Sequence, residues 1–459
     1  MKGIVPKRVL FRNFAPCMAL LVPAVAAAQA VVPETKLTPM NATNGDGGAV
    51  AISGNTVVVA NSQASRTYIF TRQGSSWSQQ VVTNAGDSGA IGGSVAASGN
   101  TFVVAQAGDR DYNAHVYVKA NCCWGLQTNL HIPNDYYVDQ ALALSGDILL
   151  AGSIDTSSYQ GSAYVFVRNG GVWTQEAQLS AGTGLYLSVA LDGGTAVLGS
   201  VGDRKAFVYV RADGSWSKQA ELSDPDSQTD DFFGQSVAIN GNTIVVGAPF
   251  RNTGAGSQHG VAVVFVRSGA TWSVQATLNP DPNNSVNDPR FGSSVSISGD
   301  LALVGTPYYW TPENGEIGAA WVFARSGTHW EGQQLVPTHV QNTAENFAAS
   351  VAIDGYFAVV GAPELYTTGR PGSAYFYDGS GVCARFARCD PMVLWVDFAY
   401  AGAQNGCVDQ PYNNLQTATA SAPTGGSLAL KPGSTAEAPT ISKRLRLEAC
   451  GGPVRIGKQ

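Results

Sequence analysis

The sequence predicts an all-β protein built around a seven-bladed β-propeller, in which seven four-stranded sheets form a ring. Three observations predict this fold. A short apolar strand followed by a glycine turn recurs at intervals of 45 to 58 residues, with first apolar positions at Val50, Val95, Leu142, Val189, Val237, Val295 and Val351. A tryptophan marks the start of a fourth strand in six copies, at Trp77, Trp124, Trp173, Trp216, Trp272 and Trp330. The inner strands are apolar on both faces, so neighbouring copies must stack to cover them.

Residues 1–30 have the pattern of a signal peptide: basic residues, an apolar run and then the small residues Ala28-Gln29-Ala30. Their removal would take away four positive charges and change the formal net charge from -6 to -10. We therefore expect a secreted or extracytoplasmic protein, for which nucleic acid and anionic membranes are poor partners. No later run is long and apolar enough to span a bilayer.

The seventh copy ends after its third strand, which would leave the edge of that blade unpaired. Thr35–Pro39 stands before the first copy much as Gln275–Pro280 stands before the sixth. The segment Val31–Leu37 is therefore predicted to be the fourth strand of blade 7 and to close the ring. The propeller is expected to span residues 31–378.

The copy between Phe233 and Leu278 shows the pattern of a blade most clearly. Ser236–Ile239 and Thr243–Ala248 flank a glycine turn and predict a hairpin. Val261–Val266 is apolar at every position, as in a strand that is covered on both faces. Trp272–Leu278 alternates apolar and polar residues, which predicts an outer strand with one face toward water.

The segments FGQSVAINGNTIVVGAP, FGSSVSISGDLALVGTP and FAASVAIDGYFAVVGAP resemble the FG-GAP repeats of integrin-alpha-type β-propellers, especially the bacterial secreted type. The resemblance runs from about Leu37 to Tyr377 and implies the propeller fold. It leaves the biochemistry open, because propellers include both enzymes and binding modules.

The composition changes after Tyr377. We expect a linker over residues 379–392, and then strands near Ser427–Leu430, Thr440–Ile441, Leu445–Glu448 and Val454–Ile456, with a short helix over residues 414–421. Residues 393–459 resemble the opening part of a pectate-lyase-like parallel β-helix. The catalytic Asp, Arg or Lys of that family has no matching position here. This small β-helix-like segment is either an accessory or a piece of a larger domain.

The long loops of the predicted propeller share one face. Antiparallel strands bring the loop between strands two and three to the same side as the loop that leads to the next blade. On blades 5 to 7 these loops carry the ligand-contact candidates Phe250, Arg251, Tyr308, Tyr309, Trp310, Tyr366 and Arg370, beside Asp224, Asp226, Asp230 and Asp231. Aromatic residues with charged neighbours suit a protein or a glycan. Alternatively, Tyr308 and Trp310 only hold their own loop in place.

The sequence predicts neither a metal site nor a cofactor. Integrin-like propellers bind calcium in an Asp-rich hairpin loop, but the corresponding turns here, such as Ser53-Gly54-Asn55, are too short to surround the ion. The turns before the tryptophans resemble the Asp-box hairpins of sialidases, although five of the six lack the Asp. The five histidines show no metal spacing, and no G-x-S-x-G elbow occurs.

Six cysteines remain after cleavage of the signal peptide, which predicts disulfides in an oxidising compartment. The local candidates are Cys383 with Cys389 and Cys407 with Cys450. Cys122 and Cys123 are adjacent in a turn and would form either a strained vicinal bridge or two free thiols.

These observations favour a secreted, monomeric, non-catalytic binding or adhesion module whose long-loop face contacts an extracellular protein or glycan. The alternative is a carbohydrate-active enzyme or its accessory domain.

Overall fold

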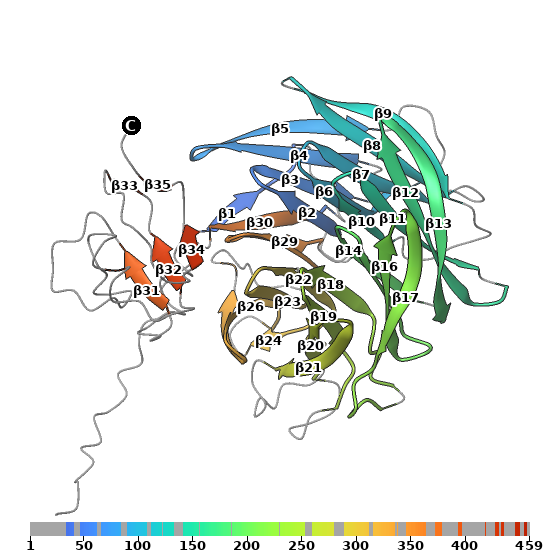
Figure 1. Cartoon of the computed structure of the whole chain (residues 1–459). Coiled ribbons are helices and arrows are strands. Elements are labelled where there is room, and N and C mark those ends of the chain that lie inside the picture. The colour runs from blue at the N-terminus through green and yellow to red at the C-terminus, as the bar shows by residue number, and fades with distance from the viewer. Residues whose placement is uncertain are drawn as a thin grey trace, which may run out of the picture. The chain divides into compact units, whose positions relative to one another are not determined.

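The computed structural model describes residues 34–40, 46–61, 66–83, 90–107, 112–121, 123–132, 141–155, 157–184, 186–228, 230–252, 259–279, 289–311, 315–335, 337, 346–363, 372–378, 393–396, 418, 427–430, 433–435, 446–449 and 454–456. Within these residues, seven four-stranded antiparallel sheets are the blades of a propeller (Figure 1).

Blades 1 to 4 follow one another along the chain. Blade 1 consists of β2 (Ala49–Ser53), β3 (Thr56–Asn61), β4 (Arg66–Gln73) and β5 (Ser76–Thr83). Blade 2 consists of β6 (Ala90–Ser98), β7 (Thr101–Ala107), β8 (Tyr112–Ala120) and β9 (Cys123–Ile132). Blade 3 consists of β10 (Leu142–Ser145), β11 (Ile148–Asp155), β12 (Gln160–Asn169) and β13 (Val172–Thr183). Blade 4 consists of β14 (Leu187–Asp192), β15 (Thr195–Ser200), β16 (Lys205–Ala212) and β17 (Ser215–Leu222).

The remaining blades depart from this plan in two places. Blade 5 consists of β18 (Ser236–Asn240), β19 (Thr243–Ala248), β20 (Val261–Ser268) and β21 (Thr271–Leu278). Blade 6 consists of β22 (Ser294–Ser298), β23 (Leu301–Thr306), β26 (Ala319–Ser326) and β27 (His329–Leu335), with a small hairpin of β24 (Trp310–Thr311) and β25 (Gly315–Glu316) between its second and third strands. Blade 7 consists of β28 (Ser350–Asp354), β29 (Phe357–Ala362), β30 (Ser373–Asp378) and the N-terminal strand β1 (Glu34–Leu37).

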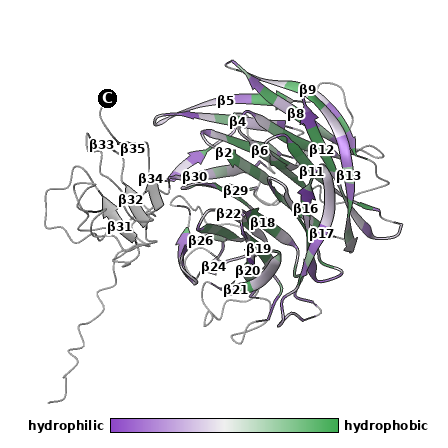
Figure 2. Cartoon of the chain, viewed as in Figure 1, coloured by the Kyte–Doolittle hydropathy of each residue, from purple (hydrophilic) through white to green (hydrophobic). Residues whose placement is uncertain are grey.

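The first strand of each blade contacts the first strands of both neighbours, so the ring is closed from β2 through β28 and back to β2. The second strands are almost completely buried, and the fourth strands expose one side to water. The hydropathy of the chain follows the same order, with apolar inner strands and more polar outer strands (Figure 2). The core therefore lies between the blades, where their apolar faces stack.

The predicted ring closure is confirmed. β1 pairs antiparallel with β30, from Glu34 opposite Tyr377 to Leu37 opposite Ala374. Leu37 is buried in the core between blades 7 and 1. The observed strand covers the second half of the predicted segment 31–37, and residues 31–33 lie outside the described part of the chain.

The Phe-Gly and Gly-Ala-Pro signatures have a packing role at the junctions between blades. Phe233 is completely buried and contacts the ring of Phe265 edge to face, with a centroid distance of 6.2 Å. In the second strand, a Cβ on Gly247 would lie 2.0 Å from the carbonyl oxygen of Gly292 at the start of the next blade. Only a residue without a side chain allows this approach between two backbones.

A continuous belt of hydrogen bonds joins the seven glycine turns on the face opposite the long loops. In each turn the glycine N–H donates to the side-chain oxygen of the last residue of the first strand in the preceding blade. The pairs, acceptor first, are Ser53 with Gly99, Ser98 with Gly146, Ser145 with Gly193, Asp192 with Gly241, Asn240 with Gly299, Ser298 with Gly355 and Asp354 with Gly54, at 2.5 to 3.0 Å. The last pair closes the belt between blades 7 and 1.

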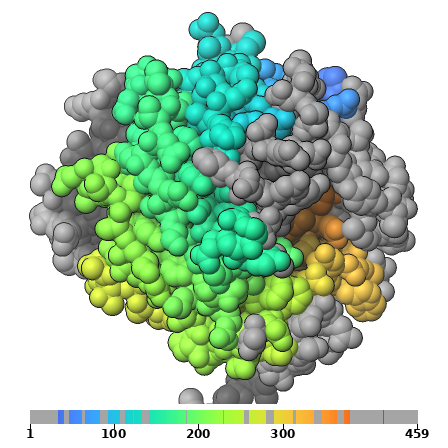
Figure 3. Space-filling model, turned by 90° about the vertical axis from the view of Figure 1, so that its right-hand side faces the viewer, coloured from blue at the N-terminus to red at the C-terminus, as the bar shows by residue number. Residues whose placement is uncertain are grey.

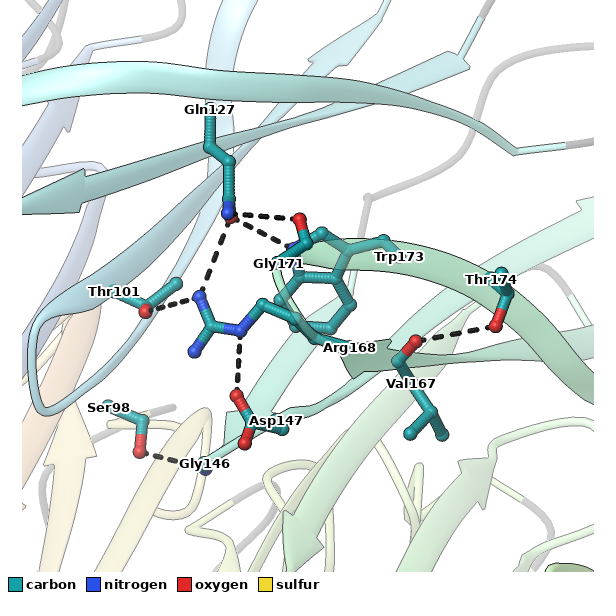
Figure 4. A network of polar contacts seen from close by, with 10 residues as sticks. All are labelled: Ser98, Thr101, Gln127, Gly146, Asp147, Val167, Arg168, Gly171, Trp173 and Thr174. Atoms are coloured by element: carbon teal, nitrogen blue, oxygen red, sulfur yellow. Dashed lines mark hydrogen bonds and ion pairs between the residues drawn. The ribbon is translucent and has the colours of Figure 1, made fainter.

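A second set of contacts fastens the outer strands of neighbouring blades (Figure 4). In blade 3 the guanidinium of Arg168 lies over Trp173, donates to Asp147 at 2.6 Å and reaches Thr101 of blade 2 at 3.1 Å. The indole N–H of Trp173 donates to Gln127 of blade 2 at 3.1 Å. Equivalent indole contacts join Trp216 to Glu176, Trp272 to Gln219 and Trp330 to Gln275, at 2.8 to 3.0 Å.

The strict alternation predicted for the fourth strand of blade 5 is wrong after its tryptophan. Val274 was expected on the buried face, but 42% of it is exposed. A β-bulge is the cause: Phe265 pairs with Val274 and Val264 pairs with Ala276, so that Gln275 is the extra residue. The bulge turns Gln275 toward Trp330 of the next blade.

The described strands beyond the propeller pair in parallel. β31 (Val393–Val396), β32 (Ser427–Leu430) and β34 (Arg446–Ala449) form one sheet, and β33 (Gly433–Thr435) pairs with β35 (Val454–Ile456) in another. The likeness of residues 393–459 to a parallel β-helix stays a prediction.

Three of the four strands expected in this region are observed. Two have the expected bounds, 427–430 and 454–456, and the strand expected at 445–448 lies one residue later. Residues 440–441 lie outside the described part. Ala418, the one described residue of the expected helix over 414–421, is helical.

Several other predictions fall on residues that the structure does not describe. These are the signal peptide (1–30), the linker (379–392) and, apart from Cys123, the cysteines of the three suggested pairs. Cys123 is exposed at the start of β9. All three pairings remain predictions.

Candidate binding surface

The connections between second and third strands, and those between consecutive blades, lie on one face of the propeller, as antiparallel pairing requires. We call this face the loop face. Figure 3 views the molecule from the right-hand side of Figure 1, with cyan residues at the top, green ones across the middle, and yellow and orange ones at the lower left and the right. Phe250, Arg251, Tyr308, Tyr309 and Trp310 all belong to loops of the loop face. The other two predicted contact residues, Tyr366 and Arg370, lie outside the described residues.

A row of side chains in contact with one another crosses the loop face from blade 4 to blade 6. Its members are Tyr186, Phe232, Phe250, Arg290 and Tyr308, and we call it the aromatic arc. The rings of Tyr186 and Phe232 are 6.1 Å apart, and those of Phe232 and Phe250 are 4.6 Å apart. The guanidinium of Arg290 lies 4.8 Å from the ring centre of Phe250 and 4.3 Å from that of Tyr308. Contacts of this kind fix side chains that loops alone would leave free to rotate.

Three of these residues, Tyr186, Phe232 and Arg290, were missed from the sequence. Phe232 and Arg290 each directly precede a buried Phe-Gly pair and have a positive φ, 56° for Phe232 and 51° for Arg290. This backbone conformation is uncommon for residues other than glycine, and nothing in their residue types announces it. A sequence signal for Phe232 and Arg290 did exist, since each stands directly before a Phe-Gly pair whose phenylalanine turns into the core.

Arg251 holds the acidic loop before blade 5 against the arc. Its guanidinium forms ion pairs with Asp224 and, at 3.1 Å, with Asp226. The Asp224 side chain is almost completely buried, and burial raises the pKa of its carboxyl group, although the Arg251 charge acts in the opposite direction. The backbone N–H of Phe250 donates to the carbonyl oxygen of Asp231 at 3.2 Å. The two loops are therefore joined by both ionic and backbone contacts.

The exposed ends of this surface are aromatic. Tyr186 is 41% exposed at one end of the arc. At the other end, Trp310 is 45% exposed and begins the β24–β25 hairpin, where it pairs with Glu316.

Tyr308 contacts Arg290 of a different loop, so its role goes beyond holding its own loop in place. The structure thus brings Phe250, Arg251 and Tyr308 into one connected group, while no contact between Trp310 and the arc is observed in the described residues.

Among the described residues, no three His, Cys, Asp or Glu side chains gather in a way that could hold a metal ion. The buried His115 lies between Asn129 and Gln106 within blade 2. In the same part of the chain, no helix has the length and hydrophobicity that crossing a membrane requires.

Comparison with protein families identifies two repeats. The family model described as FG-GAP repeat matches residues 216–265 and 272–323. These two segments are similar to FG-GAP repeats. Each match begins at the tryptophan of one fourth strand and ends in the third strand of the next blade, so the family unit spans a junction between blades. These matches and the seven observed sheets support the propeller that the sequence predicts.

Two further comparisons add little. No curated protein matches the sequence. Among solved structures, a chain of the "Crystal Structure of Mitotic Checkpoint Complex" is similar with a TM-score of 0.47 and 12% identity, over 81% of this chain and 99% of that one. A likeness at this TM-score supports no conclusion about function.

Proposed function

We propose that this protein is a non-catalytic binding protein of the cell exterior that contacts a protein partner through the loop face of blades 4 to 6. The observation that supports it is the aromatic arc, in which five side chains from separate loops hold one another across three blades. Aromatic residues and arginine are the residue types that dominate the energetics of protein interfaces.

The way the rings pack favours a protein partner over a glycan. A sugar stacks on an open ring face. Arg290 lies over the rings of both Phe250 and Tyr308, and the ring of Phe232 also contacts that of Phe250. These rings are half-buried and held by their neighbours, and such a fixed apolar surface suits the side chains of a complementary protein.

The mature chain, from residue 31, can be tested as bait for proteins of the native extracellular medium. Phe250→Ala combined with Tyr308→Ala should weaken binding of a captured partner about thirtyfold, the effect of losing a contact of about 2 kcal/mol. The affinity of wild type and variant for that partner would be measured by surface plasmon resonance.

Val172→Ala is the matched control, because Val172 is 64% exposed at the start of β13, beside the tight turn on the opposite face. Its affinity should equal that of the wild type, and both variants should keep the melting temperature of the parent. The proposal fails if the arc variant binds as tightly as the control. It also fails if a glycan array returns a ligand that is bound or turned over independently of Phe250 and Tyr308.

A further inference from the structure

The outer strands of the blades differ in how well their edges are protected against pairing with another strand. Edge strands expose unpaired backbone groups, and proteins usually shield them with charged side chains or with bulges. Within the described residues, β5, β9, β13, β17, β21 and β27 each form the outer edge of a blade. The blades that end in β9, β13, β17 and β21 carry a bulge in their last strand pair.

Strand β5 of blade 1 combines a regular edge with an absence of charge. Its sequence, SWSQQVVT, contains no Asp, Glu, Lys or Arg, and it pairs with β4 over eight consecutive positions without a shift of register. The other regular outer strand of a continuous blade, β27, carries Glu331. The closing strand β1 carries Glu34 and Lys36. Among the described outer strands, only β5 lacks both kinds of protection.

Exposed apolar side chains border this edge. Val81 within β5 is 39% exposed, and Met40 is 63% exposed. The backbone N–H of Met40 donates to the side-chain oxygen of Gln79 at 3.3 Å, which places Met40 beside the strand. An extended strand that paired with β5 would therefore gain backbone hydrogen bonds and also cover apolar surface.

We propose that the edge of β5 is an interface between two copies of this chain, which pair through β5 in an antiparallel arrangement. Two identical antiparallel strands are related by a two-fold axis, so the same edge serves both partners. Self-pairing of a charged strand would bring like charges close together, which is unfavourable, and the uncharged β5 avoids this cost. β5 lies on the rim of the propeller, so the dimer would display two loop faces and could bind a multivalent partner with increased avidity.

The mass of the purified mature chain would be measured by sedimentation equilibrium over a range of concentrations. The wild type should form dimers, and Val81→Lys should raise the dissociation constant at least about tenfold by placing like charges near the two-fold axis. Val274→Lys is the matched control, because Val274 is 42% exposed on β21, an uncharged but bulged outer strand. This control should dimerise like the wild type.

A charge exchange separates pairing through β5 from a general effect on folding. Val81→Glu alone should weaken dimerisation to the same extent, whereas a mixture of the Val81→Lys and Val81→Glu chains should form a heterodimer more tightly than either variant pairs with itself. A wild type that stays monomeric at every concentration, the state expected from the sequence, would overturn the inference. Single variants that dimerise as tightly as the wild type, or a mixture that dimerises no more tightly than either variant alone, would overturn it as well.

Discussion

At the scale of single residues, the recurring shape of each blade junction depends on positions where a side chain would not fit. Gly247 and Gly199 occupy the same place in blades 5 and 4, and a Cβ on either would lie 2.0 or 2.2 Å from a carbonyl oxygen of the following blade. In blade 7 the glycine of Phe-Gly is replaced by Ala348, which has a φ of 71°. The positions of the motif therefore differ in how strictly they require glycine.

Replacing Gly247 tests this requirement. Gly247→Ala should lower the free energy of unfolding by about 3 kcal/mol, because the new Cβ would also lie 2.3 Å from the Ser236 hydroxyl and the blades must separate. Gly125→Ala is the control, since a Cβ added to Gly125 in strand β9 would have no other atom within 4 Å and alanine should be tolerated there. Urea denaturation of both variants measures the difference. Equal stabilities would contradict the packing role.

At the scale of elements, the hairpins of each blade were predictable from the sequence, but the contacts between outer strands were not. Apolar runs and glycine turns are local patterns, and they located Thr243–Ala248 with its observed bounds. The bulge at Gln275 depends on pairing with a distant strand. A local trace of it does exist: a Gln or Glu stands three residues after each of the six tryptophans, at Gln80, Gln127, Glu176, Gln219, Gln275 and Gln333.

The bulge is the feature that makes the indole contact possible. Where the fourth strand is bulged, as at Gln127, the side chain accepts a hydrogen bond from the indole of the next blade. Blade 1 pairs without a bulge, and Gln80 instead bonds to the backbone of Trp124. The indole N–H of Trp124 is buried and has no hydrogen-bond partner in the described structure.

The hydrogen bond from the indole of Trp216 to Glu176 depends on pH, because its acceptor is a carboxylate. This carboxylate accepts two hydrogen bonds from Arg211, at 2.7 and 2.6 Å, and these hold the pKa of Glu176 below its ordinary value of 4.5. A lowered pKa in the folded state means that the stabilisation is fully present above about pH 4.5 and is lost as the pH falls through the lowered value. Glu176→Gln should therefore cost about 1 kcal/mol at neutral pH and nothing in strong acid.

The comparison is made by urea denaturation from neutral pH down to about pH 3. Gln219→Leu is the control, because Gln219 makes the same indole contact as a neutral amide and its loss should cost the same at every pH. A cost of Glu176→Gln that did not change with pH would show that the ion pair with Arg211 contributes no stability.

At the scale of the whole molecule, the sequence located the loop face but only part of its aromatic arc. Phe250 and Tyr308 were found because both follow a recognisable Gly-Ala-Pro or Gly-Thr-Pro turn in a long loop. Arg290 was missed because its stacking on both rings arises only when the ring of blades brings separate loops together. Folding of the propeller thus creates a surface that no single repeat contains.

The same ring makes the first and last blades depend on each other. Asp354 joins the belt of hydrogen bonds to Gly54 at 2.6 Å, and the hydroxyl of Ser350 donates to the carbonyl oxygen of Gly47 at 3.0 Å. Arg72 of blade 1 pairs with Asp378 at 3.1 Å and lies over Phe376 of blade 7. These contacts join blade 1 to β28 and β30 of blade 7, whereas β1 covers the outer edge of that blade.

Removing residues 31–39 while keeping residues 1–30 tests the contribution of β1. The deletion would expose the edge of β30 and remove Leu37 from the core between blades 7 and 1, so we expect aggregation or a marked fall in melting temperature. Leu37→Ala should retain the strand pairing and lose only about 2 to 3 kcal/mol for the buried side chain. Thr35→Ala is the exposed control in the same strand and should change the stability little. Light scattering measures aggregation and calorimetry measures the melting temperature, so together they separate loss of the strand pairing from loss of the Leu37 side chain. A deletion variant that is as stable as Leu37→Ala, and no more prone to aggregate, would show that closure of the ring does not require the paired strand.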